Sequence, residues 1–254
     1  MIYDLQKASL WKRISAFLFD FIMVVVVSVG MALLLSLLLG YNKYSDITES
    51  KRNYYEEKYD VDFDIKKEEY DLLDQSVHDI YDRAYAEYRS DAEVIHAENV
   101  ALALMVVILT MSILIACVLM EFVIPLILKN GRTLGKKIFG IGVIRTNCVR
   151  AGGKYLFIRA LLGKYTIEIM APIAIIIMVL FGTLNLVIGA AVLLAIVILE
   201  IVVMCTTGTR STIHDLISDT AVVDITSQLV FESEEAMLEY KKKIHAEEVA
   251  KAEY

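Results

Sequence analysis

Residues 8–40 read ASLWKRISAFLFDFIMVVVVSVGMALLLSLLLG, and this stretch decides the fold. From Ile14 to Leu39 it is almost continuously apolar. At about 1.5 Å of rise per residue, a helix of that length crosses a hydrocarbon core of about 30 Å. The stretch therefore predicts a membrane-spanning helix, uncleaved because its apolar run is longer than the core of a signal peptide.

This predicted span contains a carboxyl group, that of Asp20. A carboxylate near the bilayer centre costs about 2.5 kcal/mol or more, so spanning the membrane does not require it. Asp20 is therefore the leading functional residue, either as an ion or proton site or as a carboxylate buried against a base on another helix. Arg13 lies seven residues earlier on the same helical face and reaches the membrane surface, where it either anchors the helix end or takes part in the site.

The composition excludes most soluble classes. The chain has 254 residues, of which 57% are hydrophobic and only two are proline, as in a polytopic helical membrane protein. Its three cysteines, Cys117, Cys148 and Cys205, have no spacing typical of a zinc or redox motif. We therefore expect no metal site, no cofactor and no disulfide framework.

Residues 41–99 form a polar, acidic segment with 17 Asp and Glu against 8 Lys and Arg. Apolar residues recur at intervals of three and four from Lys66 onward, which predicts an amphipathic helix within a helical hairpin. A second apolar span, Val100 to Leu128, follows and contains Glu121.

Residues 129–164 hold nine Lys and Arg and no acid. Because short cytoplasmic loops are rich in Lys and Arg, this loop is expected inside, together with both chain termini, and the acidic segment outside. Within the loop we predict a strand-like stretch from Lys137 to Thr146 and a surface helix from Lys154 to Lys164.

The apolar tract from Ile169 to about Cys205 is too long for one span, and the residues Gly182 to Asn185 divide it. The prediction is an all-α polytopic protein with four transmembrane helices. Four parts are expected: the N-terminus with the first helix (1–40), the acidic extracytoplasmic insertion (41–99), the remaining membrane core (100–224) and a charged cytoplasmic tail (225–254).

Three separated stretches resemble one family, the RDD membrane proteins, named for an arginine and two aspartates. Ala8 to Asp20 resembles the family's opening, Asn130 to Ile144 (NGRTLGKKIFGIGVI) its middle motif, and Ser211 to Asp215 with Thr220 to Val223 its close. Ser218 and Asp219 stand where the family usually has Ala-Gly.

The resemblance assigns the family's arginine to Arg13 and its two aspartates to Asp20 and Asp215. It implies a membrane protein that is usually regarded as involved in transport, with cation and proton exchange suggested for some members. It does not cover residues 41–99 or the tail beyond about residue 225.

Each predicted span carries one carboxylate, and all four fall in the inner part of the membrane: Asp20, Glu121, Glu168 and Glu200. Carboxylates at one depth suit a proton or small-cation site, because their oxygens replace hydration and a proton competes for the same groups. The alternative is separate neutralisation by inner bases such as Arg13, Arg159 or Arg210, which we favour for the shallow Glu168. Asp215 joins the candidate site, and His214 is either a gate or an ordinary loop histidine.

These observations predict that the protein lies in the lipid bilayer of the cell membrane and transports a small cation or a proton. We expect it to act as a homo-oligomer or together with a membrane partner. The alternative is a non-transporting adaptor or sensor that binds partners through its outer hairpin and tail. We expect neither an enzyme nor a nucleic-acid-binding protein, because no nucleophile with its base, no metal cluster and no phosphate loop is apparent.

Overall fold

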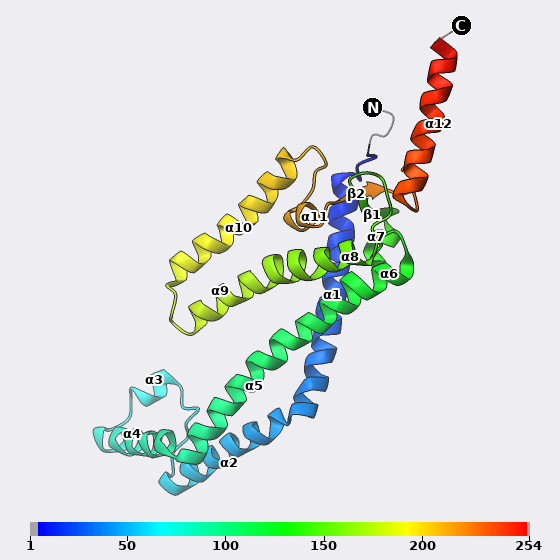
Figure 1. Cartoon of the computed structure of the whole chain (residues 1–254). Helices are drawn as coiled ribbons and strands as arrows, with labels where there is room; N and C mark the ends of the chain where they lie inside the picture. The colour runs from blue at the N-terminus through cyan, green and yellow to red at the C-terminus, as the bar shows by residue number, and fades with distance from the viewer. Residues whose placement is uncertain (1–4, 253–254) are drawn as a thin grey trace. The chain divides into compact units, whose positions relative to one another are not determined.

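The computed structural model describes residues 5–252 and is mainly helical (Figure 1). The first four and last two residues, which the predicted segments 1–40 and 225–254 include, lie outside the described part. Among residues 5–252, four continuous helices are long and apolar enough to cross a membrane, which confirms the predicted number of spans. They are α1 (Leu10–Leu39), Ala92–Leu128, Gly153–Leu180 and α10 (Leu186–Thr206).

The second and third of these helices each contain a π-helical segment. The second consists of α5 (Ala92–Cys117), the π-helix η1 (Val118–Val123) and α6 (Ile124–Leu128), and the third of α8 (Gly153–Phe157), the π-helix η2 (Ile158–Met170) and α9 (Ala171–Leu180). The prediction of a separate surface helix from Lys154 to Lys164 is therefore wrong, and so is the extent of the predicted loop 129–164. The third long helix begins at Gly153 because Arg159 and Lys164 find acidic partners and can be buried within it.

The chain forms two compact units. One comprises Ser28–Ile113, and the other comprises the chain up to Val27 and from Leu114 onward. This division lies inside two apolar helices, whereas the sequence places the boundaries of the acidic segment at residues 41 and 99. Only Gly40 separates α1 from α2, and its φ of 68° is the left-handed conformation that glycine adopts most easily.

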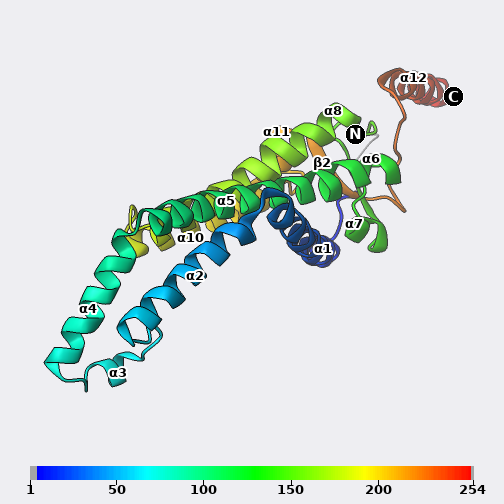
Figure 2. The same cartoon turned by 90° about the horizontal axis from the view of Figure 1, so that it is seen from below.

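Within the unit Ser28–Ile113, α2 (Tyr41–Tyr59) packs against α4 (Gln75–Ser90), with the short α3 (Lys67–Tyr70) between them in the chain (Figure 2). Phe63 contacts Tyr85 and Tyr88 with ring centroids 5.6 and 5.7 Å apart. Lys51 binds Asp91 at 3.0 Å across the same unit. Aromatic packing and ion pairs thus hold this acidic segment together.

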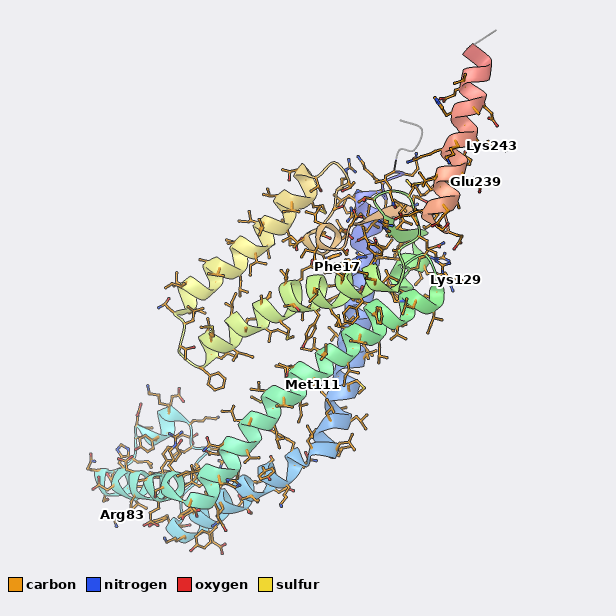
Figure 3. The ribbon with its side chains drawn as sticks, viewed as in Figure 1. Phe17, Arg83, Met111, Lys129, Glu239 and Lys243 are labelled. Carbon is orange, nitrogen blue, oxygen red and sulfur yellow. The ribbon has the colours of Figure 1, made fainter. Side chains whose placement is uncertain are left out.

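The other unit contains a two-stranded antiparallel sheet of β1 (Ile141–Arg145) and β2 (Thr220–Asp224), with Ile141 opposite Asp224 and Arg145 opposite Thr220. β1 falls within the strand-like stretch predicted at 137–146. Ile141, Val143 and Val223 are fully buried in its core. Three further helices belong to this unit: α7 (Leu134–Ile138), α11 (Ile213–Ile217) and α12 (Glu234–Ala252), the last bearing Glu239 and Lys243 (Figure 3).

Candidate functional site

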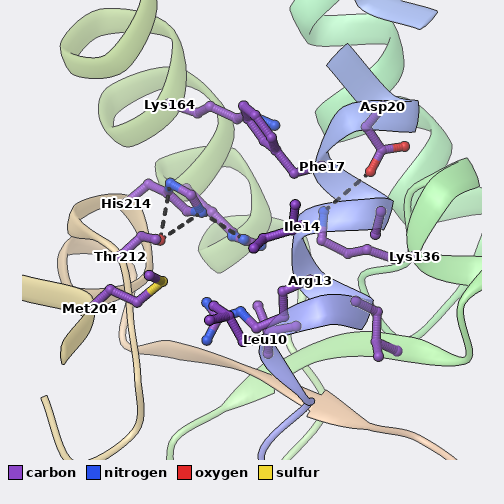
Figure 4. A pocket seen from close by; sticks show the side chains of 14 residues that line it. Leu10, Arg13, Ile14, Phe17, Asp20, Lys136, Lys164, Met204, Thr212 and His214 are labelled. Carbon is purple, nitrogen blue, oxygen red and sulfur yellow. Dashed lines mark hydrogen bonds and ion pairs between the residues drawn. The ribbon is translucent and has the colours of Figure 1, made fainter. Parts of the chain in front are cut away.

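Charged side chains gather around a cavity of about 220 Å³ in the unit that contains the sheet (Figure 4). The first turns of α1, the short helices α7 and α11, the segment η2 and the end of α10 all contribute to its wall. The titratable residues that line it are Arg13, Asp20, Lys136, Arg159, Lys164 and His214.

The π-helical segments place four of the charged groups of this region. Glu121 belongs to η1, and Arg159, Lys164 and Glu168 belong to η2. Hydrogen bonds in a π-helix reach five residues back, as from the Ala171 amide to the Thr166 carbonyl, so residues four and five apart share a face. The spacing of the three η2 residues therefore directs them to one side.

Asp20 is fully buried and binds the start of α7. Its Oδ1 accepts a hydrogen bond from the Gly135 amide at 2.8 Å, and its Oδ2 accepts one from the Thr133 hydroxyl. The ammonium group of Lys136 lies 3.7 Å from Oδ2. All three partners come from the basic stretch before β1, so Asp20 joins α1 to that stretch.

The contact between α1 and α7 requires a residue without a side chain at position 135. A Cβ atom at Gly135 would lie 2.5 Å from the Ala16 carbonyl oxygen and 3.0 Å from the Asp20 carboxyl group. Both distances are shorter than van der Waals contact, and the nearer neighbour is backbone, which cannot rotate away.

Gly135→Ala is therefore expected to lower the melting temperature of the detergent-solubilised protein by about 5 °C or more, because overpacking costs about 1 to 3 kcal/mol and breaks the Asp20 hydrogen bond as well. Gly152→Ala is the matched control, since a Cβ there meets no atom within 4 Å and its φ is −74°. Equal melting temperatures for the two variants would contradict the proposed close approach.

Asp215, at 0% exposure, lies between two arginines from different helices. Arg159 Nη2 is 3.1 Å from its Oδ1, and Arg13 Nη2 is 3.3 Å from its Oδ2. The Thr212 hydroxyl also donates to Oδ2 at 3.0 Å, within a capping box at the start of α11. Arg13 and Asp215, 202 positions apart in the chain, are thus a direct ion pair.

The arginine and the two aspartates singled out by the sequence therefore occupy one cluster, with Asp20 bound to the middle motif and Arg13 bound to the closing motif. The RDD family model matches residues 7–219, which is most of the chain. The chain belongs to the RDD family. Searches of curated proteins and of solved structures each found no match.

The position in the closing stretch where the resemblance implies a glycine has a backbone conformation that suits glycine. Asp219 stands at that position and has a φ of 50°, in the left-handed region that glycine adopts at least cost. The Asp219 carbonyl accepts a hydrogen bond from the Thr146 amide at 3.3 Å, and its carboxylate binds the Thr146 hydroxyl. These two contacts with Thr146 hold Asp219 in that conformation.

We call the two family aspartates, Arg13 and the charged residues bound to them the RDD cluster. Two of its members that lie outside the long helices, Asp215 and Lys136, have shifted pKa values. Burial alone would raise the pKa of Asp215, but the charges of Arg159, His214 and Arg13 outweigh it and hold that pKa well below its usual range. Burial lowers the pKa of Lys136 to about 8, although Glu121 opposes the shift. Asp215 is therefore held as a carboxylate, whereas Lys136 titrates close to neutral pH.

Glu121 has two basic neighbours. It accepts a hydrogen bond from the Lys164 ammonium group, and Lys136 lies 4.0 Å away. Four carboxylates are candidates for the ion or proton site, and three of them thus lie beside a base: Asp20, Glu121 and Asp215.

The fourth candidate, Glu200, has a different environment. It interacts with Glu168, and its Oε2 accepts a hydrogen bond from the Ile213 amide at 3.4 Å. Its Oε1 is buried and has no hydrogen-bond partner among the described residues. His214 Nδ1 is bonded to Glu168, so the three side chains form a connected group.

Sequence reasoning missed the residues that hold Asp20, namely Thr133, Gly135 and Lys136. All three belong to the middle motif, Asn130 to Ile144. The signal that could have found them is that the family resemblance includes this motif together with the aspartates. No group of His, Cys, Asp and Glu side chains suited to a metal ion occurs among residues 5–252.

Proposed function

We propose that the protein transports protons, alone or in exchange for a small cation, and that Glu168, His214 and Glu200 form the proton-binding group. The observation that carries the proposal is the bond between Glu168 and His214 Nδ1, together with Glu200, whose buried Oε1 has no hydrogen-bond partner among the described residues. Glu168 and Glu200 also interact electrostatically, and two neighbouring carboxylates can hold one proton between them and release it.

The histidine supplies a second place for the proton. His214 Nδ1 faces Glu168, and its Nε2 lies 2.8 Å from Arg159 Nη2 and 3.0 Å from the Thr212 hydroxyl. An imidazole can accept a proton at one ring nitrogen and release one from the other. The chain Glu200, Glu168 and His214 therefore offers a short relay between α10 and the cavity.

The other candidates support this role as fixed charges. Asp20, Glu121 and Asp215 are engaged by bases, so exchanging a cation at any of them would require breaking a buried ion pair. A proton relay needs no such step. We therefore place proton transfer at Glu200 and Glu168 and assign the family's aspartates to positioning.

We further propose that the cavity faces the cytoplasm and that the protein lies in the cell membrane with both termini inside. The support is the positive-inside rule, since residues 129–152, between the second and third long helices, contain Lys and Arg but no acid. Four helices enclose little space, so we infer that a second copy or another membrane protein completes the pathway.

The test is proton flux into proteoliposomes that contain a pH-sensitive dye, driven by a potassium diffusion potential. Glu200→Gln is expected to reduce the flux at least about tenfold, because the amide cannot carry the proton. Its melting temperature should stay near that of the wild type, since no ion pair of Glu200 is broken. Imposed sodium or potassium gradients then identify a coupled cation.

Glu239→Gln, at an exposed position of α12, is the matched control and is expected to leave the flux unchanged (Figure 3). Wild-type flux no greater than that of empty vesicles would overturn the transport proposal. Flux that Glu200→Gln leaves intact would overturn the assignment of this residue.

A second candidate is the adaptor or sensor, favoured by a surface cavity of about 350 Å³ in the unit Ser28–Ile113. Four aromatic residues are among those that line it, namely Phe63, Tyr70, Tyr81 and Tyr85. Such a surface suits a partner protein, because aromatic side chains are enriched at interfaces. This candidate predicts no flux in the same experiment.

A further inference from the structure

We propose that the cavity beside Arg159 binds the phosphate group of an anionic phospholipid. Four bases line the cavity, namely Arg13, Lys136, Arg159 and Lys164, while Asp20 is the one carboxylate among the described lining residues. The cavity volume of about 220 Å³ is below that of pockets for drug-sized molecules, about 300 to 1,000 Å³, and suits a small head group.

The charges do not balance within the ion pairs of these four bases. Three carboxylates, those of Asp20, Glu121 and Asp215, lie within 4.0 Å of them, which leaves one positive charge in excess. The remaining nearby acids, Glu168 and Glu200, do not line the cavity. Glu168 is bonded to His214 and interacts more weakly with Lys164, with no ion pair within 4.0 Å to the four bases among the described residues.

One donor at the cavity is also unused. Arg159 is 9% exposed, and its Nε is buried without a hydrogen-bond partner among the described residues. A buried N–H group that lacks a partner costs about 1 to 3 kcal/mol, so a ligand that accepts its hydrogen bond would be stabilised there. Guanidinium groups bind phosphate oxygens with good geometry, which suits this donor to a phosphoryl ligand.

The apolar side of the cavity indicates that the phosphate belongs to a lipid. Leu10, Ile14 and Phe17 line it from one face of α1 and are 43%, 39% and 53% exposed. Such a stripe can hold the start of an acyl chain (Figure 4). Trp11, 79% exposed, lies two residues before Arg13 in α1 and marks the membrane interface, where phospholipid head groups are found.

The test is the thermal stability of the full chain in a mild detergent with added dioleoyl phosphatidylglycerol, dioleoyl phosphatidylcholine or inorganic phosphate. Phosphatidylglycerol is expected to raise the melting temperature by about 5 °C, and the other two to raise it much less. Arg159→Lys keeps a charge opposite Asp215 but lacks Nε, so the shift should fall to about half. Native mass spectrometry should show the same order of lipid retention.

A second variant keeps the test informative if Arg159→Lys does not fold. Phe17→Ala removes part of the apolar stripe and is expected to weaken the phosphatidylglycerol effect, whereas Leu18→Ala, equally exposed at 53% but outside the cavity lining, should leave it unchanged. Equal shifts with phosphatidylcholine, or a full shift with inorganic phosphate alone, would overturn the proposal. So would a phosphatidylglycerol shift that neither cavity variant reduces.

Discussion

Asp215→Asn is expected to lower the melting temperature in detergent by about 10 °C, corresponding to a loss of about 3 to 5 kcal/mol. The substitution keeps the size of the side chain but removes the one charge that Arg13 and Arg159 share. Both guanidinium groups would then remain in a site where each side chain is about one-tenth exposed. An uncompensated buried charge is among the most destabilising single changes known in proteins.

Asp219→Asn is the matched control for Asp215→Asn, because its side chain is 54% exposed and lies 3.8 Å from Arg145. Exposed ion pairs contribute about 0 to 1 kcal/mol, so its melting temperature should change little. Adding Arg13→Gln to Asp215→Asn should restore part of the lost stability, because it removes one unpaired charge. A double variant less stable than the single one would contradict the assigned ion pair.

The same ion pairs give the Asp215 variant a defined pH dependence. Because the pKa of Asp215 is lowered by folding, its contribution is complete above the unfolded pKa of about 4 and is lost as the pH falls through the lower folded pKa. The deficit of Asp215→Asn should therefore be constant above about pH 4 and should shrink in stronger acid.

Asp20→Asn is expected to lower the free energy of unfolding by about 3 kcal/mol, observed as a lower melting temperature in detergent. The amide can still accept the Gly135 hydrogen bond, but it no longer balances the charge of Lys136. Adding Lys136→Met should restore part of the loss. A melting temperature equal to that of the wild type would show that Asp20 is no structural link and would return it to the list of ion sites.

The pH dependence of the Asp20→Asn deficit follows from Lys136. Because burial lowers the pKa of Lys136 to about 8, the folded protein loses this proton at a lower pH than the unfolded chain, whose lysines titrate near 10.4. Stability from this group therefore rises with pH between about 8 and 10.4. The deficit of Asp20→Asn should instead shrink as the pH rises toward about 8, because Lys136 loses its proton in the folded wild-type protein near that pH and a neutral Lys136 no longer needs the Asp20 charge. The matched control for Asp20→Asn is Asp224→Asn, which affects the ion pair with the 42% exposed Lys12 and should leave the melting temperature nearly unchanged.

Much of the fold could be predicted because the spanning helices are decided by length and hydropathy, which are local properties. The start of the third helix could not be predicted, because the charges of Arg159 and Lys164 are typical of a surface segment and indicate one at residues 153–164. Their burial depends on Asp215 and Glu121, which are distant in the chain. The Gly152-Gly153 pair looked like a turn but is the N-terminus of α8.

The position of the candidate site could be predicted from the sequence, but the contacts between its residues could not. Helical rise places the four span carboxylates at one end of the helices, and the structure surrounds that end with bases. Which base meets which acid depends on close approaches such as that of Gly135 to Ala16, which no periodicity reveals. Glu168 was assigned to a separate base in the sequence interpretation, whereas the structure bonds it to His214 beside Glu200.

The pairing of β1 with β2 and of Arg13 with Asp215 has a consequence for biosynthesis. At about 5 to 20 residues per second, a ribosome needs about 10 to 40 s to extend the chain by the 202 positions from Arg13 to Asp215. During that time Arg13 lacks its acidic partner, whereas Asp20 gains its partners once Thr133, Gly135 and Lys136 are made. Strand β2 follows all four spanning helices in the chain, so nascent chains that stop before Thr220 cannot close the sheet. Those that stop before Asp215 also expose the unpaired charge of Arg13 to quality control.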